Sequence, residues 1–202
     1  MTQHVPAYLL RIAQVTAIAL TASVATQIIY VTVGNLGMEP DRQIIWSLEV
    51  LAFLAVSITG LALVRVRPLI GAAIAAGGIL NTIQAGMGLV MFGPLGDGGE
   101  ALAPVFSAVL AMAFLLYFAG KAAFGIAALA AGATLWKDGN GATHVMGILA
   151  ALAGLVAVVL NGLAIVLDAQ MTYLAGGAGT AATLLLALVL VPATRGTAAE
   201  AV

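Results

Sequence analysis

Long uninterrupted runs of apolar residues dominate the chain, and short intervals rich in turn-forming and charged residues separate them. A membrane-spanning helix needs about 20 mostly apolar residues, and six runs reach that length. Membrane-spanning β-strands would instead alternate apolar and polar positions over about ten residues. The pattern predicts an all-α integral membrane protein with short loops and one transmembrane domain over residues 1–202. Its helices are expected at about 8–33, 43–64, 69–92, 103–135, 143–166 and 170–193.

The fourth run is too long for one simple crossing, because residues 101–136 would extend about 54 Å as a helix. It is either one helix kinked near Gly120 and Gly125, or two crossings split at Lys121, which would give seven helices. The positive-inside rule favours one crossing. With six helices and a cytoplasmic N-terminus, only Arg42 lies outside. The other basic residues are then cytoplasmic: Arg11, Arg65, Arg67, Lys121, Lys137 and Arg195. We therefore predict six helices with both termini in the cytoplasm.

Composition leaves no soluble alternative. Hydrophobic residues make up 63% of the chain and charged residues 7%, against about 45–50% and about 25% in soluble domains, and the mean hydropathy is +1.16. The net charge of -1 offers no basic surface for nucleic acid. Cysteine is absent and only two histidines occur, so no metal site is predicted and no cofactor is assigned. The lipid bilayer is the expected partner. The alanine- and glycine-rich composition is typical of a bacterial inner-membrane protein.

Polar side chains inside the apolar runs are the candidate functional residues, because each costs free energy in a bilayer unless it is paired or faces a cavity. Most of them lie in the half of the membrane predicted to face outward. Glu49 is the ionisable group assigned to this region, and Arg42 lies two turns earlier on the same helix face. In the structural alternative, Glu49 is solvated from the membrane surface and the amide side chains only hold neighbouring helices together. The candidate ligand-binding residues are Gln27, Tyr30, Trp46, Glu49, Asn81, Gln84, Asn161, Asp168 and Tyr173.

Lys121 is expected near the cytoplasmic interface, because it lies about 25 Å along its helix from the outer end. Its ammonium group would then snorkel into the lipid headgroups. Pairing with Glu49 is not expected, since the two residues would occupy opposite leaflets. In the following helix, a seven-residue rhythm typical of close helix packing joins Gly147, Gly154, Asn161 and Asp168. Such glycine-rich faces would also serve contacts between copies of the chain, so a homo-oligomer is one predicted assembly.

No zinc-protease, nucleophile-elbow or phosphate-loop motif is present in the sequence. The leading prediction is a non-catalytic membrane protein that binds or moves a small or lipophilic ligand through an outward-facing polar cavity. Gln27, Asn81 and other amides would donate and accept hydrogen bonds there, and Tyr30, Trp46 and Tyr173 would line the mouth. Two alternatives stay open. One is a helix-packing structural subunit or scaffold of a membrane complex, and the other is an intramembrane enzyme acting on a lipid-like substrate.

Overall fold

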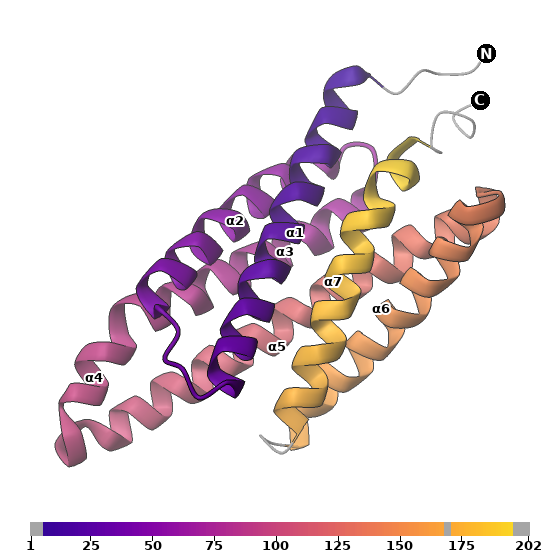
Figure 1. Ribbon diagram of the computed structural model, residues 1–202. Coiled ribbons are helices and arrows are strands. Elements are labelled where there is room, and N and C mark those ends of the chain that lie inside the picture. Colours follow the sequence, from indigo (N-terminus) through magenta and orange to yellow (C-terminus); the bar gives the residue numbers. More distant parts are fainter. Residues whose placement is uncertain (1–5, 168–170, 196–202) are drawn as a thin grey trace.

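The computed structural model describes residues 6–167 and 171–195, and these residues form helices joined by short turns (Figure 1). The described residues contain no β-strand, so the predicted all-α class is confirmed. The elements in chain order are α1 (Ala7–Asn35), α2 (Arg42–Leu63), α3 (Pro68–Met87), the π-helical turn η1 (Gly88–Phe92), α4 (Gly93–Asp97), α5 (Gly99–Asp138), α6 (Gly141–Leu167) and α7 (Thr172–Arg195).

Six helical stretches of the described chain are long and apolar enough to cross a membrane, which confirms the predicted number. The stretch that raised the question of a seventh crossing is one unbroken helix, α5, of 40 residues. Lys121 lies within this helix without interrupting it, and its side chain is fully buried inside the bundle. The seven-helix alternative is therefore wrong. At the usual helical rise α5 is about 60 Å long, which exceeds the roughly 30 Å of a hydrocarbon core.

The long helices pack in chain order around a ring, α1–α2–α3–α5–α6–α7, which closes by contact between α7 and α1, and α5 also contacts α7. The start of α1 and the end of α7 lie at the same end of the bundle (Figure 1). Arg67, in the turn before α3, donates a hydrogen bond to the backbone oxygen of Ala193 in α7 at that end. We call it the inner end, and we call the end that holds residues 36–41 and α4 the outer end. The start of α1 and the end of α7 therefore lie on one side, and the positive-inside rule predicts that this side is the cytoplasm.

The apolar run predicted as one helix over 69–92 lies within one continuous helical stretch, Pro68–Asp97, in which η1 is a π-helical turn and α4 is the continuation. Gly88 begins the π-helical turn, and a Cβ atom there would lie 3.1 Å from the ring of Trp46. The glycine thus lets an aromatic ring pack against the backbone. Phe92 closes the turn and packs edge-on against Trp46, with 5.6 Å between ring centroids. Through this continuation, α4 and the first turns of α5 extend past the α1–α2 loop at the outer end (Figure 1).

Glycines bring α5 and α6 into backbone contact. A Cβ atom at Gly154 would lie 2.5 Å from the backbone oxygen of Gly125, and one at Gly132 would lie 2.5 Å from that of Gly147. No side chain fits at such distances, so these glycines set how closely the two helices approach. The close packing predicted for Gly147 and Gly154 is confirmed. It also holds α5 firmly in the position from which it presents its polar residues to α1, α2 and α7.

Candidate functional site

Polar side chains from four helices meet inside the outer half of the bundle. Hydrogen bonds, a cation–π contact and electrostatic attraction connect them into one group, which we call the polar cluster. Its members are Thr26 and Gln27 of α1, Glu49 of α2, Tyr117 and Lys121 of α5, and Thr180 of α7. Two ionisable side chains of opposite charge type, Glu49 and Lys121, therefore lie inside the bundle.

Lys121 is the centre of the polar cluster and is 0% exposed. Its Nζ donates a hydrogen bond of 2.7 Å to Oε1 of Gln27, and the same oxygen accepts a bond of 3.0 Å from the Thr180 hydroxyl group. Nζ also lies 5.5 Å from the centroid of the Tyr117 ring. The stem of the lysine passes over Gly179, where a Cβ atom would lie 2.7 Å from Cβ of Lys121. Helix α7 thus provides space for the lysine by having no side chain at that position.

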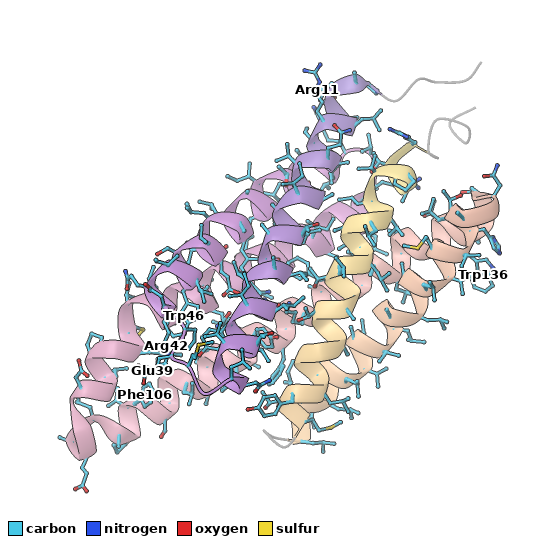
Figure 2. The ribbon with its side chains drawn as sticks, in the orientation of Figure 1. Arg11, Glu39, Arg42, Trp46, Phe106 and Trp136 are labelled. Carbon is cyan, nitrogen blue, oxygen red and sulfur yellow. The ribbon has the colours of Figure 1, made fainter. Side chains whose placement is uncertain are left out.

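The predicted position of Lys121 near the cytoplasmic interface is wrong. Glu49 and Lys121 attract each other electrostatically, but among the described residues no hydrogen bond or salt bridge joins them. The depth of Lys121 was counted from the start of its helix, but the first turns of α5 extend past the outer loop. Figure 2 shows Phe106 at the same end of the bundle as Glu39 and Arg42. In addition, helical side chains point back toward the N-terminus of their helix, which brings the ammonium group of Lys121 nearer to the outer end.

Glu49 is 6% exposed and accepts a hydrogen bond of 3.2 Å from the Thr26 hydroxyl group. The nearby cation that attracts its carboxylate is Lys121, while Arg42 is exposed at the start of α2. An ammonium group has three N–H donors and a carboxylate has about four acceptor positions. Among the described residues, the ammonium group makes one hydrogen bond and the carboxylate accepts one, and both are to neutral side chains. Both charged groups therefore keep unused hydrogen-bonding capacity.

The two buried asparagines predicted for the site serve packing. Asn81 and Asn161 are both 0% exposed. Each donates a 2.8 Å bond to the backbone oxygen four residues earlier in its own helix. Asn161 also donates a 3.0 Å bond to the backbone oxygen of Ala175, which ties α6 to α7. Gly120 on α5 has no side chain, and the Asn81 amide group of α3 occupies the place that a Cβ atom there would take. The structure thus uses both side chains between helices and does not join them to the polar cluster.

The aromatic candidates Tyr30 and Trp46 lie nearer the outer end than the polar cluster. Their rings are 6.2 Å apart between centroids, and Trp46 continues this row to Phe92. Tyr173 is 88% exposed and points away from the bundle interior, so it does not line a mouth with them. Gln84 is half-buried on α3. Asp168 lies outside the described residues.

Of the nine predicted site residues, the structure brings Gln27 and Glu49 into the polar cluster. The other four members are absent from the predicted set. One signal for them is present in the sequence: Tyr117 and Lys121 are four residues apart on one helix face, the spacing at which helical side chains meet. The other half of the contact, Gly176 and Gly179 opposite them on α7, is recognisable only once the helices are placed.

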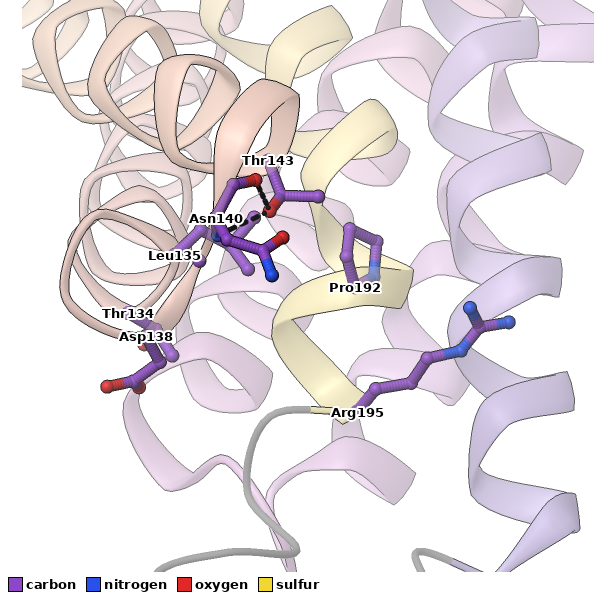
Figure 3. Close-up of a pocket in the computed structure, with 8 residues that line it drawn as sticks. Thr134, Leu135, Asp138, Asn140, Thr143, Pro192 and Arg195 are labelled. Carbon is purple, nitrogen blue, oxygen red and sulfur yellow. Dashed lines mark hydrogen bonds between the residues drawn. The ribbon is translucent and has the colours of Figure 1, made fainter.

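Two cavities among the described residues lie at the inner end, away from the polar cluster. One of about 290 Å³ separates the α5–α6 turn from the end of α7 (Figure 3). Thr143 and Asn140 in its wall hydrogen-bond to each other and close that turn. A second cavity of about 210 Å³ lies beside it and is lined by Arg67 and Lys137, among others. Their polar groups belong to the turn and the membrane surface.

The described residues hold no group of three or more side chains suited to bind a metal ion. The polar cluster offers a cation, an anion, two amide or hydroxyl acceptors and several donors, which suits it to binding a polar group or holding a proton. Comparison of the chain with protein-family models, with curated proteins and with solved structures gives no match in any of the three.

Proposed function

We propose that the protein binds a small or amphiphilic ligand at the polar cluster, or moves it across the bilayer, without catalysing a reaction. The observation that carries this proposal is the buried pair of Glu49 and Lys121, each bonded to a neutral side chain and each left with unused hydrogen-bonding capacity. Ionisable groups inside a membrane protein mark ligand or ion sites by default, because apolar residues would fill the same space at lower cost. A ligand with polar groups completes the missing bonds.

The proposed location is a bacterial inner membrane. Six apolar helices of the described chain support a multi-pass protein in a lipid bilayer, and short loops with an excess of basic residues at one end agree with the orientation of such proteins. The ligand site then lies in the leaflet that faces away from the cytoplasm.

Native mass spectrometry of the protein, purified in mild detergent and in lipid nanodiscs, tests the proposal. We expect a defined bound mass on the wild-type protein that is lost from Lys121→Met and from Glu49→Gln. Lys137→Met and Glu100→Gln are matched controls, because they remove exposed charges of the same kinds from α5 and should keep the bound mass.

A wild-type protein that carries no bound mass in either medium would contradict the proposal, as would a mass that survives both cluster substitutions. A stoichiometric second polypeptide in the spectrum would instead support a structural subunit of a membrane complex.

A further inference from the structure

We infer that the ligand is a single-chain amphiphile with a carboxylate head group, such as a free fatty acid, and that it reaches Lys121 sideways from the bilayer between α1 and α7. The inference rests on the proposed function, since it names the ligand of the same polar cluster. Three observations carry it: which side of the cluster is partly exposed, what surrounds that side, and which hydrogen-bonding groups are present there.

The polar cluster is buried on the side of α2 and α5 and partly exposed on the side of α1 and α7. Glu49 is 6% exposed, and Phe53 and Phe124 behind it are 0% exposed and stacked on each other. In contrast, Gln27 on α1 and Thr180 on α7 are only half-buried. The fully buried ammonium group of Lys121 is therefore reached past these two neutral side chains.

The partly exposed side of the polar cluster, between α1 and α7, faces the bilayer. Ile28 and Val31 on α1 are 53% and 49% exposed, and Leu174 on α7 is 60% exposed. Gln27 lies eight residues before the end of α1, and Thr180 lies eight residues after the start of α7, so both are about 12 Å from the outer ends of their helices. A ligand that arrives at this depth between apolar side chains must itself dissolve in the outer leaflet.

The hydrogen-bonding groups on this partly exposed side favour a ligand with an anionic head group. The ammonium group of Lys121 uses one of its three N–H donors on Gln27. The Thr180 hydroxyl group donates its one hydrogen to the same Gln27 oxygen, so the further donors here are the Tyr117 hydroxyl group and the Gln27 amide. The carboxylate of Glu49 is held behind them through Thr26, which is 9% exposed. A carboxylate ligand accepts from these donors, whereas a cationic head would have to pass Lys121 to reach Glu49. The negative charge of Glu49 already attracts Lys121, so a singly charged head group fits better than a phosphate.

Two neighbouring glycines offer a matched test of the route. A Cβ atom at Gly176 would lie 3.1 Å from the hydroxyl oxygen of Tyr117, a member of the polar cluster. The next residue, Gly177, has nothing within 4 Å of such an atom. Valine at 176 would crowd the Tyr117 hydroxyl group on the proposed route without changing any charge, whereas valine at 177 adds the same side chain away from it.

The experiment is titration of the detergent-solubilised protein with palmitate, followed by native mass spectrometry. Palmitate should bind saturably, and hexadecanol and hexadecylamine should bind at least about tenfold more weakly, because a charged hydrogen bond is lost. Lys121→Met and Gly176→Val should each weaken palmitate binding by about tenfold or more, while Gly177→Val should stay within about twofold of the wild-type value. Thermal unfolding of each variant shows that it is folded, and the two glycine variants keep the test valid if Lys121→Met does not fold.

Equal binding of palmitate and hexadecanol, or palmitate binding that is unchanged in Gly176→Val, would overturn the inference. Tighter binding of phosphatidic acid than of palmitate, with the same dependence on Lys121, would overturn the inferred carboxylate head group and favour a phosphate head group. If palmitate does not bind while the isolated protein carries another mass that depends on Lys121, the proposed function stands and the inference fails. If neither mass is seen, both fail.

Discussion

Removal of one charge from the buried pair should destabilise the protein far more than removal of both. We expect Lys121→Met and Glu49→Gln each to lower the free energy of unfolding by about 3 kcal/mol, because the remaining charge stays buried without its counter-charge. The double variant should lie within about 1 kcal/mol of the wild-type protein, because apolar or neutral replacements of buried ion pairs are often neutral in effect.

The size of the expected change follows from the burial and the hydrogen bonds of the pair. Lys121 is 0% exposed and Glu49 is 6% exposed, so water does not replace the lost partner. Breaking a buried ion pair costs about 3–5 kcal/mol, and here the two charges attract each other without a direct hydrogen bond. Each charge retains one neutral partner after the other is removed, Gln27 for the ammonium group and Thr26 for the carboxylate. These bonds compensate part of the loss, and we therefore expect the lower end of that range.

The assay is unfolding by sodium dodecyl sulfate in mixed micelles, followed by circular dichroism, for the wild type, both single variants and the double variant. Lys137→Met and Glu100→Gln remove exposed charges and should change stability by less than about 0.5 kcal/mol. If the two single effects simply add in the double variant, the charges are not coupled and the reasoning is refuted. A double variant that is as stable as the wild type, yet binds no ligand, would show that the charges serve binding.

Two further predictions concern packing and topology. Gly154→Ala should destabilise the protein by about 2 kcal/mol, because the backbone of α5 occupies the space. Gly162→Ala, with nothing within 4 Å, should stabilise it by up to about 1 kcal/mol, and equal effects in the same unfolding assay would contradict the contact. The chain has no cysteine, so Glu100→Cys and Lys137→Cys can each be labelled with a membrane-impermeant maleimide in intact cells. Label is expected at position 100 alone, and label at position 137 alone would reverse the topology.

The fold could be predicted from the sequence because each crossing is a long apolar run, a signal that depends on no other part of the chain. The part of α5 that crosses the membrane could not be identified in the same way. An apolar run of 40 residues does not show which of its turns lie beyond the membrane. Similarly, η1 depends on the contact between Gly88 and Trp46. Apolar composition is the same for a regular helix and for one that widens to accept a ring from its neighbour.

The candidate site could be predicted only in part, for a related reason. Glu49 and Gln27 stand out because a polar side chain in an apolar helix is costly wherever its partner lies. Their partners depend on which helices touch and at what depth. The depth predicted for Lys121 is wrong because it is measured from the start of α5, which extends past the α1–α2 loop (Figure 1). Thr180 gives no signal of its own, because a threonine in a membrane helix usually bonds to its own backbone.

The space around Lys121 argues that the charge is not an accident of packing. A Cβ atom at Gly179 would lie 2.7 Å from Cβ and 2.9 Å from Cγ of the lysine, and one at Gly176 would lie 3.1 Å from the Tyr117 hydroxyl oxygen. Helix α7 therefore lacks side chains at the two positions that face the tyrosine and lysine, although glycine in a helix interior costs about 1 kcal/mol relative to alanine. A leucine on α5 opposite an alanine on α7 would fill the same space with better propensity and no buried charge. Gly176, Gly179 and Lys121 each lower the stability of the bundle, and together they keep one ammonium group in its interior. Such an arrangement is expected where that group binds a ligand.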